Sequence, residues 1–417
     1  MHYSILENRT NSLIRFFLCL IIFWLPYSPA VVESSVIIGL LLWLLKRGMA
    51  FHRSGGAWAA FRLPATPLNK PIFVFVIICI FSSLISPFWE QSLPNFLTKT
   101  LEWFIVYFLV IEGVTEKKHI YLIFGVFTVT LLATVLDSLV QYYVTYKDVF
   151  LGRMIDPGAR ATAGFKAPNG LGAYLTVAAP MIFTWIFKRN VSFKYRSLVA
   201  LLFFLVTWSL AVTFSRGAWS TAFLGIIFFV LLLTFPEKRR AFYFVFVVVL
   251  ILVVLCGLLG FILTRDWQNS SLRYDTISWR LHIWKDALKM IEDSPIFGHG
   301  INTFMQVFEK YRSDRGANPT YAHNSYLQLT VETGIIGLVS FLWILGNLFR
   351  WASSYISRHG TRSDDLILPA LGVWSGITAF LLQSFFDNQF YSLQLSVYLW
   401  FMIGFFVAMT KVIKWQN

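Results

Sequence analysis

Long runs of apolar residues alternate with short polar segments along almost the whole chain. A helix needs about 20 apolar residues to cross a bilayer core of about 30 Å. Twelve runs approach that length, with the approximate limits 12–30, 32–46, 71–87, 100–113, 119–142, 169–187, 197–213, 217–235, 241–264, 328–349, 366–384 and 389–410. Because unpaired backbone groups are costly in lipid, each run is predicted to be a helix.

The predicted fold is therefore an all-α integral membrane protein with about twelve transmembrane helices. It forms a single polytopic membrane domain over residues 1–417. The first run has no convincing small-residue cleavage site, so it is interpreted as a retained span rather than a signal peptide.

Lys and Arg gather in alternate connecting segments, which predicts an orientation by the positive-inside rule. With a cytoplasmic N-terminus, 21 of the 35 basic residues fall in cytoplasmic segments, and the C-terminus is cytoplasmic too. The other 14 basic residues lie on the outer face. One of them is Lys99, and the rest lie in 147–166, at Arg216 or in 265–315. Topology does not explain these cations on the outer face.

Composition agrees with a lipid-embedded chain. Hydrophobic residues make up 57% of the sequence and charged residues 13%, about half of the roughly 25% that is typical of soluble domains. A net charge of +14 would suggest nucleic acid for a soluble protein, but here Lys and Arg serve as topology anchors, and no nucleic-acid partner is expected. The three cysteines lie inside apolar runs and form no metal or disulfide pattern.

Two arginines on the outer face require an explanation. Arg216 lies between two apolar runs with almost no loop, and an arginine at membrane depth costs about 2.5–3.5 kcal/mol unless it faces a cavity or partner. Arg160 precedes a turn rich in Gly and Pro, where Asn169 is predicted to cap the next helix and leave N–H groups free for an anion. The alternatives are snorkelling for Arg216 and an ordinary polar loop for Arg160.

The long loop over 265–327 on the outer face, periplasmic if the chain is bacterial, is predicted to carry two short amphipathic helices. The apolar stripe of the first consists of Ile277, Leu281, Trp284, Leu288 and Ile291, with Asp286 and its charged neighbours on other faces. Arg280 lies beside this stripe and can point into the bundle, and Pro295 ends the helix. The second helix is indicated by Ile301, Phe304, Phe308 and Tyr311.

His323 opens the tenth predicted span and is a candidate proton acceptor, because the imidazole pKa lies near neutrality. An interfacial polar residue is the alternative. Asn324 follows it as a candidate helix cap. Asp387 lies in the last outer turn and is either a supporting acid or a structural ion-pair partner.

The order of several short motifs resembles the O-antigen ligase and polymerase superfamily. These are Asn169-Gly170-Leu171-Gly172, Ser215-Arg216-Gly217, Arg280 with Trp284, Gly298-His299-Gly300, His323-Asn324-x-Tyr326-Leu327 and Glu332-x-Gly334. The match covers most of residues 160–340, and the twelve-span topology fits the whole chain. Members of this family are metal-independent, inverting membrane glycosyltransferases that use glycans carried on undecaprenyl pyrophosphate.

The resemblance implies an O-antigen ligase of the bacterial inner membrane. Such an enzyme transfers a polysaccharide from undecaprenyl pyrophosphate to a lipid A-core sugar on the periplasmic face, without a metal or other cofactor. By resemblance, Arg160, Arg216 and Arg280 would hold the pyrophosphate, and His323 would activate the acceptor hydroxyl. The supporting residues would be Asn324, Trp284 and, as a looser match, Asp387.

Other functions remain open at this point. A polymerase would use the same donor and extend a growing glycan, and a third member type moves glycans onto protein. From another class, a lipid-linked glycan transporter or flippase would keep ionisable residues near the bilayer midplane. Asp137 is such a residue, but the unexplained cations gather at one face, which favours transfer over transport.

Overall fold

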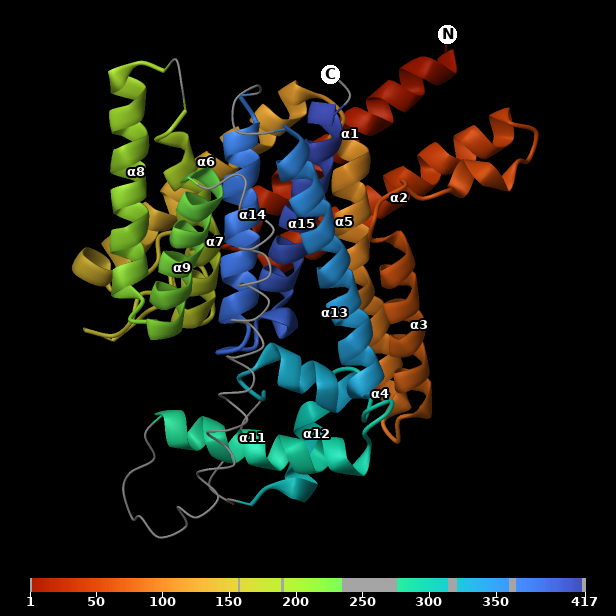
Figure 1. The fold of residues 1–417 in the computed structure, drawn as a ribbon, viewed down its shortest axis with the longest axis vertical. Helices are drawn as coiled ribbons and strands as arrows, with labels where there is room; N and C mark the ends of the chain where they lie inside the picture. The colour runs from red at the N-terminus through yellow and green to blue at the C-terminus, as the bar shows by residue number, and fades with distance from the viewer. Residues whose placement is uncertain are drawn as a thin grey trace.

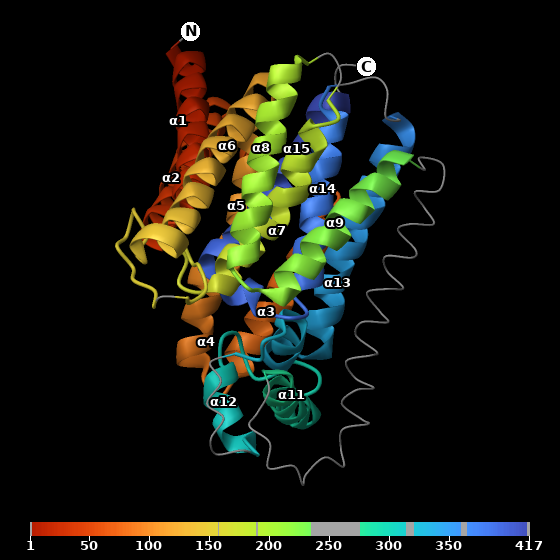
Figure 2. The same cartoon turned by 90° about the vertical axis from the view of Figure 1, so that its left-hand side faces the viewer.

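The computed structural model describes residues 2–156, 158–188, 191–234, 276–313, 321–359 and 365–414. The described elements are helices joined by short connections (Figures 1 and 2). The helices are α1 (His2–Trp24), α2 (Pro29–Arg53), α3 (Asn69–Ile85), α4 (Trp89–Asn95), α5 (Leu101–Gly113), α6 (Lys117–Val140), α7 (Pro168–Trp185), α8 (Phe193–Val212), α9 (Arg216–Thr234), α11 (Thr276–Asp293), α12 (Phe304–Tyr311), α13 (Ser325–His359), α14 (Ile367–Gln383) and α15 (Leu393–Lys414).

Six of the described helices are long and apolar enough to cross a membrane, judged by length and composition alone. They are α2, α6, α8, α9, α13 and α15, and α3 and α14 are shorter apolar helices. The chain is thus a helical membrane protein, whereas the full count of twelve spans stays a prediction. The predicted span 241–264 lies outside the described residues.

The centre of the bundle is formed by α14 and α15. Nearly every side chain of α14 is buried, and it packs against α7 and α9. α15 packs against α5 and α14, and 94% of its most apolar window is buried, compared with 22% in α2. α2 and α8 are therefore peripheral helices whose apolar side chains face outward, as lipid contact requires.

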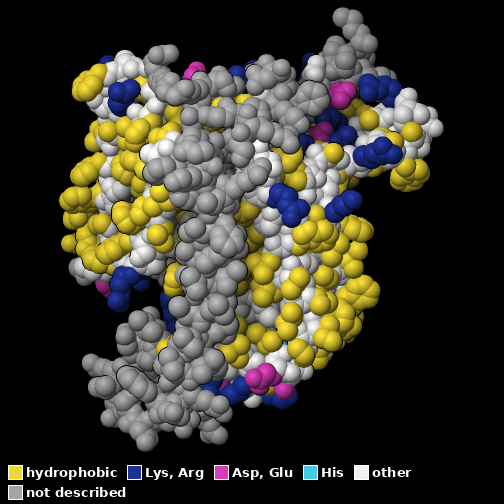
Figure 3. All heavy atoms as spheres, in the orientation of Figure 1, with side chains coloured by type: hydrophobic (Ala, Val, Ile, Leu, Met, Phe, Trp, Pro, Cys, Tyr) yellow, Lys and Arg dark blue, Asp and Glu magenta, His cyan; other side chains and the backbone are white. Residues whose placement is uncertain are grey.

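At mid-height, hydrophobic side chains cover much of the left-hand and right-hand parts of the surface, and Lys and Arg lie near both ends, with some between them on the right (Figure 3). At each end, hydrogen bonds join segments that are far apart in the sequence. At the end that carries α11 and α12, the Ser86 hydroxyl donates to the carbonyl of His299, and Gln306 donates to Gln91. At the opposite end, Lys411 donates to the carbonyl of Ala65. We call these the α11 end and the opposite end.

The first predicted span, 12–30, extends past the end of the helix that the structure shows. α1 ends at Trp24 and α2 begins at Pro29, because Pro26 cannot continue the first helix. Pro29 instead occupies the first turn of α2, where a missing N–H costs nothing, and Ser28 caps that helix by accepting from the Val31 N–H.

The two predicted amphipathic helices are present as α11 and α12, but the buried face of α11 was assigned wrongly. Ile283, Asp286, Ala287 and Met290 are buried, and α12 and α13 pack against this side. Asp286 tolerates burial because it accepts from the backbone N–H and hydroxyl of Ser313 and pairs with Lys289. The contacts with Ser313 depend on the tertiary fold, so the spacing of apolar residues within the helix does not predict them.

α13 is broken at Gly334, whose φ of 70° and ψ of −178° are not helical. A Cβ at this position would lie 1.9 Å from the carbonyl oxygen of Ile296, so only glycine fits. The connection that follows α11 docks into the break. The N–H of Ile335 donates to Pro295, and the N–H groups of His299 and Gly300 donate to Val331 and Glu332. The two predicted glycine motifs therefore join the outer helices to the bundle.

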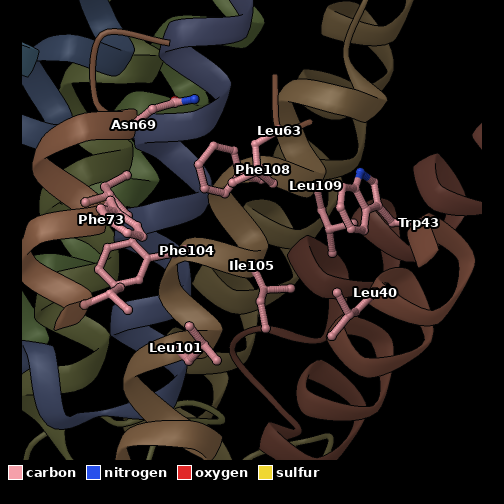
Figure 4. Close-up of a pocket in the computed structure, with 12 residues that line it drawn as sticks. Leu40, Trp43, Leu63, Asn69, Phe73, Leu101, Phe104, Ile105, Phe108 and Leu109 are labelled. Carbon is pink, nitrogen blue, oxygen red and sulfur yellow. The ribbon is translucent and has the colours of Figure 1, made fainter. Parts of the chain in front are cut away.

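An apolar hollow of about 260 Å³ lies between α2, α3 and α5 (Figure 4). Its lining includes Trp43, Phe73 and Phe104, and Asn69 is its one polar side chain. Its lining carries no acidic, basic or imidazole side chain, so the hollow offers no proton acceptor and no cation for an anionic ligand.

Candidate functional site

His323 and Asp387 form a pair at the α11 end. The Nδ1 atom of His323 lies 3.3 Å from Oδ1 of Asp387, although the two residues are 64 positions apart. Both side chains are partly accessible, at 26% and 19%. A carboxylate can only accept, so in the neutral imidazole the proton resides on Nδ1 and the Nε2 lone pair is free. No hydrogen bond to Nε2 is formed within the described residues, so this nitrogen can accept a proton.

The backbone around this pair is held by several hydrogen bonds. His323 has a φ of 51°, in the left-handed region that directs the chain into α13. Asn324 Oδ1 accepts from the N–H groups of Tyr326 and Leu327, at 3.0 Å each, which confirms its predicted role as a cap. Ser325 donates through its hydroxyl to the carbonyl of Asp387 at 2.9 Å. The start of α13 is thus fastened to the α14–α15 connection.

Arg280 reaches this connection from α11. Its Nη1 donates to the carbonyl of Phe386 at 2.7 Å, one residue before Asp387. Its Nε is buried and has no hydrogen-bond partner among the described residues. Because a buried guanidinium N–H without a partner is costly, this donor is suited to an incoming acceptor.

Arg160 lies in the connection between α6 and α7 and is held by two neutral oxygens. Nε donates to the carbonyl of Thr213 at 2.7 Å, and Nη2 donates to Oδ1 of Asn169 at 2.6 Å. The prediction that Asn169 caps α7 was therefore wrong. Its side-chain oxygen is engaged by Arg160, and Ala167 occupies the cap position without a side-chain hydrogen bond.

Arg216 is the first residue of α9, and its side chain is exposed. No described residue forms a hydrogen bond or ion pair with its guanidinium. Its neighbour Gly217 lies against Phe386, since a Cβ on this glycine would be 3.5 Å from the Phe386 Cβ. The backbone of Arg216 therefore adjoins the segment that carries Asp387.

Trp284 supports the pair indirectly. Its indole N–H donates to the carbonyl of Ala322 at 2.9 Å, immediately before His323. Trp279, which the sequence did not indicate, lies closer, with its ring centre 5.1 Å from that of His323. The signal that could have identified Trp279 in the sequence was its position directly before the candidate residue Arg280.

The charges of this cluster influence one another. Burial lowers the pKa of Arg160, an effect opposed by the charge of Asp387 and reinforced by Arg280. Burial alone would raise the pKa of Asp387, but hydrogen bonds from His323 and the Asn388 N–H, with the charge of Arg280, leave it below its ordinary value. Asp387 is therefore ionised at neutral pH. The structure thus brings together Arg160, Arg280, His323 and Asp387, with the backbone of Arg216 beside them.

Three buried polar residues near the pair were not predicted to take part. Gln328 and Glu332 lie one turn apart in α13, and Asn388 follows Asp387. Polar side chains spaced by four residues in an otherwise apolar helix were the signal that could have identified Gln328 and Glu332.

Asp137, whose role the sequence left open, accepts from the backbone N–H of Val149 at 2.7 Å and lies outside this cluster.

Two comparisons with known proteins match parts of this chain. A 123-residue stretch is 27% identical to an uncharacterised protein of Haemophilus influenzae, over 28% of this chain and 31% of that protein. The match thus spans about a third of the relative's length. Residues 198–342 match the family described as O-antigen ligase, and this stretch contains Arg216, Arg280 and His323. The match supports the O-antigen ligase superfamily as the family of this chain.

Proposed function

We propose that this chain is a membrane glycosyltransferase of the O-antigen ligase type. It transfers a polysaccharide from undecaprenyl pyrophosphate to a lipid A-core sugar, on the periplasmic face of the bacterial inner membrane. The observation that carries the proposal is the convergence of the His323–Asp387 pair with Arg160 and Arg280, from segments far apart in the sequence. The α11 end is the periplasmic end in this assignment, since the anchoring cations predominate at the other.

The arginines bind the pyrophosphate of the donor. Guanidinium groups match phosphate oxygens with paired N–H donors, and each arginine here keeps donors that its protein partners do not use. Their partners are neutral oxygens, so their positive charge is not cancelled by direct pairing. Arg216, exposed beside Phe386, supplies a third cation when the donor is bound. These cations stabilise the negative charge that develops on the departing pyrophosphate.

His323 acts as the general base. Nε2 takes the proton from the acceptor hydroxyl while that oxygen attacks the anomeric carbon of the donor. The bond between this carbon and the phosphate oxygen breaks, and undecaprenyl pyrophosphate leaves with the electron pair. Asp387 orients the imidazole through Nδ1 and stabilises the imidazolium that forms. A single displacement inverts the configuration at the anomeric carbon.

The test is transfer by the purified protein in nanodiscs, with undecaprenyl-pyrophosphate-linked glycan as donor and core lipopolysaccharide as acceptor. We expect transfer with inversion by the natural protein. His323→Ala should bind the donor with similar affinity but lose about 10²–10⁴-fold in kcat, the usual contribution of a general base. Transfer at the natural rate by this variant would refute the base assignment.

A deletion strain separates the related activities. Loss of all long polymer from core lipid, with accumulation of lipid-linked polymer, is the result expected for a ligase. Loss of chain length with single repeat units still attached would instead indicate a polymerase. Movement of lipid-linked glycan between leaflets, without any transfer by the purified protein, would indicate a transporter and overturn the proposal.

A further inference from the structure

A chain of hydrogen bonds between buried groups connects Glu332 to the neighbours of His323 and Asp387. The backbone N–H of Asn302 donates to Oε2 of Glu332 at 2.6 Å, and Nε2 of Gln328 donates to Oε1 of the same carboxyl group at 3.0 Å. The Gln328 Oε1 accepts from the backbone N–H of Ala322 at 3.1 Å and from the side-chain amide of Asn388. The chain therefore ends at the residue before the base and the residue after its carboxylate partner.

Glu332 and Gln328 are almost inaccessible, at 0% and 1% exposure. At a buried position, a donor that faces another donor, or an acceptor that faces another acceptor, costs about 1–3 kcal/mol. The side-chain amide of Gln328 is therefore strongly held in one orientation. Within the described residues, neither side chain forms a hydrogen bond with His323 or Asp387. Any effect on the pair must pass through Ala322 and Asn388.

The two backbone donors fix the direction of every bond in this chain. An N–H can only donate, so the Ala322 N–H requires the oxygen of the Gln328 amide, whose NH₂ must then face position 332. The N–H of Asn302 requires an acceptor at the other side of position 332. That residue must therefore accept from both directions, which a carboxylate does and a carboxamide cannot.

We propose that Glu332 and Gln328 form a positioning relay that holds His323 and Asp387 in register for proton transfer. The inference rests on the proposed function, because it assigns the relay to the base of that reaction. Both residues are positioning residues, since they act on the base only through Ala322 and Asn388.

The proposal predicts an effect of hydrogen-bond direction that burial alone would not produce. In Glu332→Gln, the new NH₂ must face either Asn302 or Gln328. If the Gln328 amide turns to accept from it, two N–H donors then oppose one another at Ala322. If the NH₂ faces Asn302 instead, the two N–H donors oppose one another there. We expect the arrangement with the conflict at Ala322, which shifts the segment that carries the base, and a misplacement of about 1 Å can cost about 10²-fold in rate.

Exchanging the two residues restores the donor and acceptor directions of the bonds to Asn302, Ala322 and Asn388. In the double variant Gln328→Glu with Glu332→Gln, the new amide accepts from Asn302 through its oxygen and donates through its NH₂ to the new carboxylate. That carboxylate then accepts from Ala322 and Asn388. The exchange keeps composition, burial and total charge, and it moves the carboxylate by one helical turn.

The first measurement is amide hydrogen exchange at Ala322, resolved by mass spectrometry of the full chain in nanodiscs. We expect exchange to be faster in Glu332→Gln and to return to the natural rate in the exchanged double variant. This readout does not depend on any catalytic activity. An unchanged exchange rate at Ala322 in Glu332→Gln would overturn the relay.

The second measurement is transfer kinetics on the same proteins. We expect kcat to fall by about 10- to 100-fold in Glu332→Gln with little change in KM for the donor, and to recover in the double variant. A fall in kcat together with a rise in KM that the double variant does not reverse would indicate general damage to the fold and would overturn the relay.

Glu112→Gln is the matched control. It makes the same chemical change at a carboxyl group that also accepts from two donors, Lys46 and Arg47, at the opposite end. Exchange at Ala322 and kcat should stay at natural values in this variant. If the natural protein transfers no glycan but Ala322 shows the expected exchange pattern, the proposed function fails and the structural relay stands.

Discussion

The two ends of the bundle hold their cations in different ways. At the opposite end, Lys46 and Arg47 both contact the carboxylate of Glu112, at 2.6 Å each. At the α11 end, Arg160 and Arg280 donate instead to carbonyl and amide oxygens, which carry no net charge. Cations paired with a carboxylate lose much of their outward field, whereas cations on neutral oxygens keep it.

The difference separates cations that stabilise the fold from cations that are available to a ligand. The carboxylate at the α11 end, Asp387, bonds to His323 rather than to an arginine. Its negative charge offsets part of the positive charge of the cluster, but it forms no direct ion pair with Arg160 or Arg280. The variants that follow test whether this distinction corresponds to a division between binding and structural roles.

The largest effect is expected from Arg280→Ala. Removal of a preorganised donor to developing negative charge typically costs about 10²–10³-fold in kcat, and glycan transfer by the purified variant should fall by that factor. Arg47→Ala, which removes a paired cation at the opposite end, is the control and should retain natural transfer. Equal losses in the two variants would contradict the comparison.

Asp387→Asn should reduce kcat by about 10- to 100-fold. An amide cannot supply the negative charge that stabilises an imidazolium, and it can present an N–H to His323 in place of an acceptor. Donor affinity, measured by fluorescence with a labelled lipid pyrophosphate, should stay the same or rise because a nearby negative charge is removed. Weaker donor binding with an unchanged kcat would assign Asp387 to the donor site instead.

Glu112→Gln should lower the free energy of unfolding by about 1–3 kcal/mol, because Lys46 and Arg47 then lie close together without a counter-charge. Thermal denaturation in detergent measures this change, and transfer below the denaturation temperature should be unaffected. A loss of transfer at full stability would show that the cations of the opposite end also participate in the reaction.

The smallest effect is expected from Asn324→Ala. Loss of the cap that accepts from Tyr326 and Leu327 costs about 1 kcal/mol of stability. Asn324→Asp keeps an acceptor oxygen and should retain the stability of the natural protein in the same denaturation assay. If the aspartate variant is as unstable as the alanine variant, the side chain does more than cap α13.

Features that rest on local chemistry were predicted from the sequence. Apolar length predicted helices, Asn324 was recognised as a cap, and arginines in apolar surroundings stood out because lipid gives them no partner. Arg280 beside Trp284 was recognised in the same way, and its guanidinium does reach the α14–α15 connection.

Features that depend on distant partners were not predicted. Asn169 fits the pattern of a cap, but Arg160 takes its oxygen. Asp286 fits an exposed face, but Ser313 satisfies it inside the fold. The pairing of His323 with Asp387 crosses 64 positions, and no local pattern encodes such a distance.

The break in α13 has a mechanical consequence. The chain that follows α11 is inserted at Gly334, so the helix that carries Arg280 and the helix that begins after His323 are locked at a common point. A tilt of α11 would therefore carry both residues together. Arg280 and His323 would then keep their spacing under a force applied to one side of the protein.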